Sequence, residues 1–528
     1  MRTSVSTDRI AEWRQALGGR WAVAVLALYL AIVFVLAALM PLADPDLPMH
    51  LAVGEWIAQH HAFPFVEPFA WTRVGAPYFA YSWLVEVSAY ELLAVLGPAG
   101  PHLLYGFIAA AAVVAVVVMG RVEGWRPWPT LLLAVLHFVV LTRVTPSLRP
   151  QVVLYVLVPL AWAATVRIRK EGDGRTLWPL IALFAIGAVA ANTHLLFALT
   201  GAPIFVLAID PPARKRYAFY AVLAVVAGWL CSPYGLAWPD VFRLNFAPNP
   251  LFRQPSPISE YQPGFSVSPV IGAFLALVPL LATWALVPSD ERGWVGRVGR
   301  REWAIAALWL VGLVAFSRVE KAVTIWWLVS LPLAGAAISR IPDPRSIARA
   351  RLRTVILAAV GLLLCAEHAV LGRSLRDPEG TVVTRTLPGR GPVSAEPFAA
   401  WLRAHARPSG RARLLTTFSF GSYLTWRLPE YSSSIDSRTI FPDSVAEPEA
   451  LVMRANAGSE FGPWRSADVA LVPDWYAVAA VLDTAAGWVR LAGPYPQRST
   501  ARQLGIWARR AWWDSVRVEP EGSAGAGL

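Results

Sequence analysis

Two carboxylates and an imidazole lie within a stretch of seven residues, in the run Ala-Asp-Pro-Asp-Leu-Pro-Met-His at 43–50. Proline disfavours helix in the residue before it, so Asp44 is expected in an extended tip. Asp46 is expected to cap a helix that runs to about residue 60, which places His50 near the first turn. Such a set can bind a divalent cation or act as a general base. Spacing alone leaves open the alternative that Asp46 only caps the helix and Asp44 is a solvated charge.

Further polar residues stand in the loops that join long apolar runs. Charges this close to a bilayer core usually face a protein interior or a water-filled cavity, and arginine is suited to holding phosphate oxygens bidentately. We therefore expect these residues to bind substrate, with interfacial snorkelling as the alternative for the arginines. They are Glu86, Arg149, His194, Glu260, Arg318 and Lys321, together with His50 of the first run.

Composition excludes several classes of protein. The chain has 528 residues, of which 56% are apolar and 16% charged, against about 25% charged in an ordinary soluble domain. This excludes a disordered protein and argues against one soluble domain. Two cysteines, Cys231 and Cys365, exclude a disulfide framework and a thiolate cluster. The sequence has no Walker loop, no dinucleotide-binding Gly-rich turn and no Gly-x-Ser-x-Gly, so an ATP-driven or serine-hydrolase reaction has no support.

Apolar runs long enough to cross a bilayer recur from residue 21 to residue 372. The first, 21–40, has no charge and is longer than a signal-peptide core, so we expect a retained span. The run 176–209 is too long for one helix, and folding it at 192–194 gives two short spans, for eleven spans in all. The other runs lie near 101–119, 127–142, 150–166, 217–235, 266–287, 302–316, 322–338 and 354–372.

Basic residues set the orientation of these spans. With residues 1–20 in the cytoplasm, 22 basic residues lie in the inner segments and 7 in the outer connections before residue 372, as the positive-inside rule requires. The net charge of +12 therefore marks the cytoplasmic face, and nucleic-acid binding is not expected. A span at the helical stretch 80–97 would invert every later loop, so this helix is expected along the outer surface, within a long first outer loop at 41–100.

After residue 372 the chain becomes polar and follows an odd number of spans, so it is expected outside the membrane. Short β-type runs at 413–417, 432–436, 469–472, 488–492 and 504–507 alternate with helical patterns at 394–405 and 475–485. The expected fold is thus an α-helical polytopic membrane domain, 21–372, followed by an extracytoplasmic α/β domain, 373–528.

Together these features resemble the GT-C superfamily of membrane glycosyltransferases, which includes aminoarabinose transferases and protein O-mannosyltransferases. The shared pattern is a first span, an acidic outer loop with an Asp-x-Asp tip, a surface helix, many spans and an outer C-terminal domain. A bacterial GT-C-like group is more similar still. Its short motifs here are Asp44-Pro45-Asp46, His50-Leu51, Pro68-Phe69-Ala70-Trp71-Thr72, Trp83-Leu84-Val85-Glu86, Arg149-Pro150-Gln151, Asn192-Thr193-His194, Pro233-Tyr234-Gly235, Ile258-Ser259-Glu260, the Gly-x-Tyr-Leu-x-Trp of 421–426 and Asp436-Ser437-Arg438.

The resemblance implies transfer of a sugar from a polyprenyl-phosphate donor to an acceptor at the extracytoplasmic face of a bacterial inner membrane. Asp44 is then expected as the catalytic base, with Asp46 as a second catalytic carboxylate. A divalent cation, Mg²⁺ or Mn²⁺, held by Asp46 and His50 would assist. Cations are also needed beside the phosphate as the glycosidic bond breaks. The expected ones are Arg149, Arg318 and Lys321.

Other positions leave the function open. Pro48, Met49, Glu67 and Ser82 stand where the group has two aromatic residues, an Asp and an acidic residue. One alternative is therefore a non-catalytic membrane platform, an inactive relative whose outer domain binds a partner. A transporter or flippase is disfavoured, because the polar residues gather at the outer ends of the spans and the two halves do not match. The Asp-x-Arg at 436–438 is interpreted as a structural pair or as a contact to the acceptor.

Overall fold

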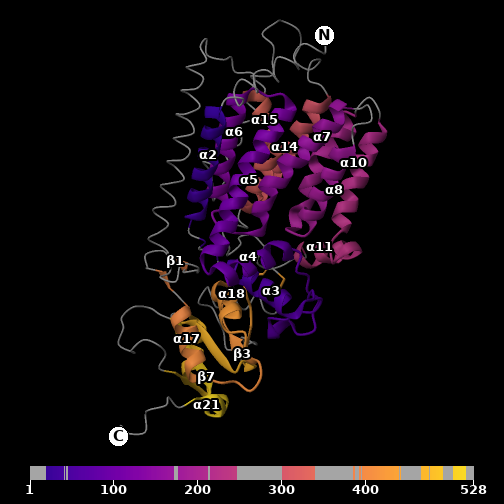
Figure 1. Ribbon diagram of the computed structural model, residues 1–528. Coiled ribbons are helices and arrows are strands. Elements are labelled where there is room, and N and C mark those ends of the chain that lie inside the picture. Colours follow the sequence, from indigo (N-terminus) through magenta and orange to yellow (C-terminus); the bar gives the residue numbers. More distant parts are fainter. Residues whose placement is uncertain are drawn as a thin grey trace.

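Apolar helices form a bundle in the first part of the chain, as Figure 1 shows. The computed structural model describes residues 20–40, 42, 44, 46–171, 177–211, 215–246, 300–338, 385–386, 392–393, 395–438, 440–441, 465–474, 476–491 and 504–518. Short 3₁₀ helices, η2 (Pro150–Val153), η3 (Leu195–Gly201) and η8 (Glu320–Ala322), lead into α7, α9 and α15. The bundle helices are α2 (Arg20–Ala38), α5 (Ala99–Glu123), α6 (Pro127–Val144), α7 (Leu154–Glu171), α8 (Leu177–Ala191), α9 (Ala202–Ile209), α10 (Arg216–Leu230), α14 (Arg300–Arg318) and α15 (Val323–Ile338).

Each predicted apolar run that falls in the described part is helical, and the run 176–209 breaks at 192–194 as predicted. By length and composition, α5, α6 and the stretch Pro150–Lys170 are long enough to cross a membrane. Helix α10 and the following Gly235–Phe246 pass the same test only as a pair bent by 97°. The runs 266–287 and 354–372 lie outside the described residues, so the count of eleven spans stays a prediction.

A turn at the end of α8 holds two bundle helices together. The glycine at 228 in α10 lies so close to α8 that a methyl group there would clash with the carbonyl oxygen of Phe184, and small residues of this kind let helices associate in membranes. Asn192, just after α8, donates from its side-chain amide to the carbonyl oxygen of Cys231 at 2.7 Å. The turn 192–194 is therefore fixed to the end of α10.

The segment between α2 and α5 lies across one end of the bundle, beside the sheet domain (Figure 1). It contains α3 (Leu47–His60), η1 (Trp71–Arg73) and α4 (Trp83–Leu96), so the helix predicted at 80–97 is confirmed as α4. A methyl group at Gly54 would clash with the carbonyl oxygen of Glu86, which shows how closely α3 and α4 approach. At the same end, η4 (Gly235–Ala237) and α11 (Trp238–Phe246) follow α10.

Beyond this end the chain forms a five-stranded sheet with the strand order β4-β3-β5-β7-β6. Strand β3 pairs in parallel with β4 and with β5, whereas the β5–β7 and β7–β6 pairs are antiparallel. The strands are β3 (Ala412–Leu415), β4 (Tyr431–Ser433), β5 (Val469–Pro473), β6 (Trp488–Arg490) and β7 (Leu504–Arg509), with a separate antiparallel pair β1 (Arg385–Thr386) and β2 (Pro392–Val393).

Helices cover both faces of the sheet. Helices α17 (Glu396–His405) and α18 (Phe418–Arg427) pack with Leu414, and α20 (Ala477–Thr484) packs with Leu415 on the opposite face, as the alternation of side chains along a strand requires. Trp71, from the segment between α2 and α5, joins the cluster under α20. A last helix, α21 (Arg510–Val516), follows β7. Strands and helices both occur in this part, as predicted, while the extracytoplasmic domain as a unit stays a prediction and its boundary near residue 372 lies outside the described residues.

The sequence pattern does not predict α18, because Phe-Ser-Phe-Gly-Ser-Tyr-Leu-Thr-Trp-Arg at 418–427 contains mostly residues that favour helices weakly. Tertiary contacts support this helix instead. A methyl group at Gly421 would clash with the carbonyl oxygen of Ile435 and would lie 2.9 Å from the Cα atom of Asp436. Helix α18 therefore fixes the backbone that carries Asp436.

We predict that Gly421→Ala destabilises the protein by about 1–3 kcal/mol, the usual cost of overpacking a well-packed site. The matched control is Gly410→Ala, because a methyl group at Gly410 meets nothing within 4 Å. Thermal unfolding of both full-length variants in detergent measures the difference. Equal unfolding midpoints for the two variants would contradict the close packing of α18 on residues 435–436.

Candidate functional site

A polar cavity with a volume of ≈ 120 Å³ lies where the bundle, the segment between α2 and α5, and the sheet domain meet. Its wall comes from the start of α3, the residues before α4, the start of η2, the turn after α8, α11, η8 and the segment 437–440. Six residues predicted to form a site line this cavity, together with an arginine of the sheet domain. The charged and imidazole side chains are Asp46, His50, Glu86, Arg149, His194, Lys321 and Arg438.

Asp44 is buried behind the cavity wall, where it binds Arg149. The Nε atom of Arg149 donates to Oδ2 of Asp44 at 2.5 Å and Nη2 donates to Oδ1 at 3.2 Å. The hydroxyl of Ser147 also donates to Oδ2, and the backbone N–H of Asp46 donates to Oδ1 at 2.9 Å. Burial by itself would raise the pKa of Asp44, but Arg149 and these hydrogen bonds lower it to about 2. Both oxygens of Asp44 are thus occupied, and its contacts position Arg149.

Asp46 faces the cavity in front of this pair. Its carboxylate lies 3.4 Å from Nη2 of Arg149, and its side chain is 25% exposed. Helix α3 does begin after Asp46, as predicted, but the side chain makes no capping hydrogen bond. Asp46 therefore stands at the predicted capping position, but the predicted capping hydrogen bond is wrong, because the carboxylate is directed to Arg149.

His50 and Glu86 form a pair across the contact between α3 and α4. Nδ1 of His50 lies 2.8 Å from Oε1 of Glu86, and a carboxylate in this position accepts the Nδ1–H of the imidazole. The other carboxylate oxygen, Oε2 of Glu86, is buried and has no hydrogen-bond partner within the part of the chain that the structure describes. The close approach at Gly54 brings the two helices near enough for this bond.

The turn after α8 places His194 in the same cavity. The indole N–H of Trp83 donates to Oδ1 of Asn192 at 2.6 Å, which ties α4 to the turn. Nδ1 of His194 accepts a hydrogen bond from the backbone N–H of Leu196 at 3.0 Å. Burial at the cavity wall, with Lys321, His50 and Arg149 nearby, lowers the pKa of His194 to about 3. The motif Asn-x-His is thus explained by one structural amide and one imidazole at the cavity.

Of the three remaining residues predicted to bind substrate, one lines the cavity. Lys321, in η8, lines the cavity as expected. Arg318, at the end of α14, is exposed and is not part of the cavity wall, so the structure does not bring it to the other predicted residues. Glu260 lies outside the described residues.

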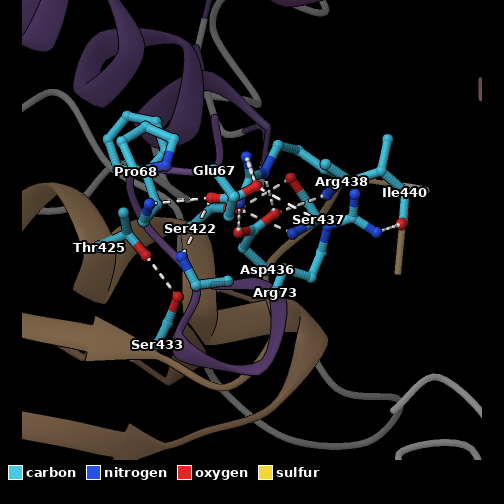
Figure 2. Close-up of polar contacts among 12 residues, drawn as sticks. Glu67, Pro68, Arg73, Ser422, Thr425, Ser433, Asp436, Ser437, Arg438 and Ile440 are labelled. Carbon is cyan, nitrogen blue, oxygen red and sulfur yellow. Dashed lines mark hydrogen bonds and ion pairs between the residues drawn. The ribbon is translucent and has the colours of Figure 1, made fainter. Parts of the chain in front are cut away.

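The sheet domain contributes Arg438, whose side chain is only 12% exposed and lies between two buried carboxylates (Figure 2). Its guanidinium donates to both oxygens of Asp436 at 2.8 and 2.6 Å and to both oxygens of Glu67 at 2.9 Å. It also lies over the ring of Tyr78, 5.0 Å from the ring centre. Burial by itself would lower the pKa of Arg438, but the two carboxylates raise it well above its ordinary value, so the charge is retained.

This cluster joins the sheet domain to the segment between α2 and α5. Around it, the hydroxyl of Ser432 donates to the carbonyl oxygen of Phe69, and that of Thr72 donates to the carbonyl oxygen of Ser434, each at 2.6 Å. Arg73 donates to the carbonyl oxygen of Ile440. The structural interpretation of Asp436 and Arg438 is confirmed by these contacts, and Arg438 in addition lines the cavity.

Sequence reasoning missed the cavity residues Asn245, in α11, and Ser437. Asn245 sits in an amphipathic stretch that carries no motif, so the sequence offers no signal for it. Ser437 is the middle residue of the Asp-x-Arg motif, in which the sequence points to the charged residues Asp436 and Arg438 and not to the residue between them. Tyr234 belongs to the Pro-Tyr-Gly motif of the sequence. Its hydroxyl accepts a hydrogen bond from the backbone N–H of Ala80 at 2.6 Å, which fixes the cavity wall before α4.

Among the described residues, no group of three or more His, Cys, Asp or Glu side chains is arranged to hold a metal ion. Asp46 and His50, the predicted ligands, both line the cavity. The contact of His50 with Glu86 is the arrangement by which proteins orient a metal-binding imidazole. A divalent cation at these residues stays a prediction.

The chain matches no protein-family model and no curated protein. Its fold does match solved membrane glycosyltransferases of the GT-C superfamily. The arabinofuranosyltransferase AftD from Mycobacteria aligns with a TM-score of 0.56 at 17% identity over 92% of this chain, which spans 40% of the AftD chain. ArnT from Cupriavidus metallidurans aligns over 94% of this chain and 98% of its own when bound to undecaprenyl phosphate, with a TM-score of 0.56 at 14% identity. The protein therefore has a GT-C-like fold.

We predict that Arg438→Ala destabilises the protein by about 3–5 kcal/mol, because it leaves the carboxylate of Asp436 buried without its cation and that of Glu67 with only the more distant Arg73, at 3.9 Å. The matched control is Arg413→Ala in the same domain, where the arginine is 48% exposed and pairs with Asp468 at 3.2 Å. An exposed pair contributes about 1 kcal/mol or less. Chemical unfolding of the full-length variants measures both, and a loss for Arg438→Ala no larger than for the control would refute the role of the cluster.

Proposed function

We propose that this GT-C-like membrane protein is a glycosyltransferase that moves a sugar from a polyprenyl-phosphate donor to an acceptor at the extracytoplasmic face. The observation that carries the proposal is the cavity at the sheet-domain end of the apolar bundle, where Arg149 and Lys321 stand beside Asp46. A lipid phosphate held at the end of the spans would meet these groups. The solved ArnT structure with bound undecaprenyl phosphate supports this donor class.

The reaction needs one bond to form and one to break. The acceptor hydroxyl oxygen bonds to the anomeric carbon, the bond from that carbon to the phosphate oxygen breaks, and the electron pair stays on the phosphate. Arg149 and Lys321 offset the charge that develops on the phosphate, and Arg149 is preorganised because the protein holds it before the substrate arrives. For Arg149 that support is the buried carboxylate of Asp44.

The proton of the acceptor hydroxyl has to pass to a base within hydrogen-bond reach. We assign this role to Asp46, since its partly exposed carboxylate lines the cavity. The family resemblance points to Asp44 as the base, but both carboxylate oxygens of Asp44 already accept hydrogen bonds from the protein. A role for Asp44 in positioning Arg149 fits these contacts better.

A divalent cation, Mg²⁺ or Mn²⁺, is part of the proposal as a group that Asp46 and His50 would hold. The unpaired Oε2 of Glu86, beside His50, supports this fit because it leaves a buried carboxylate oxygen available. When bound, the cation would supply additional positive charge for the phosphate.

We further propose that the protein lies in a bacterial inner membrane, with residues 1–20 in the cytoplasm and the sheet domain outside. The concentration of basic residues in the inner segments supports this orientation. It would place the cavity at the outer face, where the acceptor is reached. Beyond the lipid donor and the membrane, protein partners are unknown.

Lys321 and Arg318 offer a matched test of donor binding, because both are basic residues of one turn and only Lys321 lines the cavity. We predict that Lys321→Gln lowers the occupancy of added undecaprenyl phosphate at least about tenfold, since a hydrogen bond to a charged group is lost. Arg318→Gln leaves the occupancy unchanged. Native mass spectrometry of the full-length proteins measures it. Wild-type protein that binds no such lipid would shift the interpretation to a non-catalytic platform.

The two carboxylates can be separated in the same way. We predict that Asp46→Asn keeps the unfolding midpoint of the wild type but slows transfer by about 10²–10⁴-fold, as loss of a general base does. The sugar-linked polyprenyl phosphate then accumulates on the purified protein, which mass spectrometry detects. Asp44→Asn instead lowers the unfolding midpoint, because Arg149 loses its buried partner. A normal rate of transfer by Asp46→Asn would exclude Asp46 as the base.

A further inference from the structure

The ring of His194 is held in one orientation by the backbone of its own turn. His194 precedes η3 with an extended backbone (φ −163°, ψ 149°), and its Nδ1 accepts the backbone N–H of Leu196 at 3.0 Å. A backbone amide can only donate, so Nδ1 must carry a lone pair. In the neutral imidazole the proton therefore sits on Nε2, and within the described residues nothing hydrogen-bonds that nitrogen.

The surroundings keep this imidazole neutral. His194 is partly buried in the cavity wall, where the cations Lys321 and Arg149 and the imidazole of His50 also lie. Burial and these positive charges act in the same direction, and they lower the pKa of His194 to about 3. The ring is thus a poor proton acceptor at neutral pH, and its one lone pair, on Nδ1, already accepts the N–H of Leu196.

His50, across the same cavity, presents the opposite nitrogen. Its Nδ1 lies against the carboxylate of Glu86 and so carries the proton, which leaves a lone pair on Nε2 of the neutral ring. An anionic oxygen in the cavity is attracted by an N–H and repelled by a lone pair. Of the two histidines, His194 is therefore the one fitted to an anion.

We infer that His194 is a neutral hydrogen-bond donor, fixed in its Nε2–H tautomer by the N–H of Leu196, that binds an oxygen of the donor phosphate. This inference rests on the proposed function. The ligand is assigned as phosphate because Arg149 and Lys321 line the same cavity and attract the same anion. The two cations supply charge, and His194 adds a directed N–H without a third charge to desolvate. Because its ring is already held, binding requires no reorganisation.

Two substitutions separate the two roles of His194, which are accepting the N–H of Leu196 at Nδ1 and donating the Nε2–H to the phosphate. In His194→Asn the Oδ1 atom replaces Nδ1 as the acceptor for Leu196, since asparagine is a good capping residue, but nothing reaches the place of Nε2. In His194→Gln the amide nitrogen reaches about as far as Nε2, but the cap is lost. The probe is undecaprenyl phosphate without a sugar, titrated by native mass spectrometry, with thermal unfolding measured in parallel.

We expect His194→Asn to keep the unfolding midpoint and to weaken undecaprenyl phosphate binding about 10- to 100-fold, the effect of one hydrogen bond to a charged group. We expect His194→Gln to lower the midpoint and to bind within a few-fold of the wild type. Unchanged binding by His194→Asn would overturn the phosphate assignment and point to a sugar hydroxyl instead. Wild-type protein that binds none of this lipid would refute the proposed function, which is a separate result.

The tautomer has its own readout, independent of the lipid. In ¹⁵N-histidine spectra of the full-length protein at neutral pH, the signal lost in His194→Asn identifies His194. We expect a neutral ring with a protonated Nε2 and an unprotonated Nδ1. A charged ring, or a proton on Nδ1, would overturn the inference whatever the lipid does.

Discussion

The buried charge of Arg438 is the constraint on which the site depends. A guanidinium in this environment requires anionic partners, because an unpaired buried charge is very costly. It finds them in Asp436 of its own domain and in Glu67 of the segment between α2 and α5. This interaction joins the sheet domain to the bundle end (Figure 2), and residues of both parts line the cavity.

Near the contact of Arg438 with Asp436 and Glu67, close backbone contacts set the positions of the polar side chains of the cavity. Gly54 lets α3 reach α4, so that His50 meets Glu86. Asn192 binds both Trp83 and the end of α10, so that His194 stands opposite His50 in the cavity. Groups that catalyse or bind need this kind of support, because a loosely held side chain loses preorganisation. The short motifs of the sequence are therefore partly site residues and partly the residues that hold them.

The cavity combines a paired Arg149, a lysine, two histidines and a partly exposed carboxylate at the end of an apolar bundle. Asp44 illustrates how the same residue type divides into roles, since it is buried to position Arg149 while Asp46, two residues later, faces the cavity. A donor phosphate and an acceptor hydroxyl need charges of both signs within one small volume. In this GT-C-like fold the arrangement lies at the end of the apolar bundle, beside the sheet domain.

The sequence by itself determined the apolar helices of the described part, the break at 192–194, the strands of the sheet domain and most of the charged and imidazole side chains of the cavity. Each of these follows from local hydrophobic periodicity or from a polar residue beside an apolar run. Only the tertiary structure decided that Arg318 lies outside the cavity, that Asp44 pairs with Arg149 and that Arg438 meets Glu67, 371 residues away in the chain. Such pairings depend on how distant segments pack, and no local pattern encodes which charge will face which.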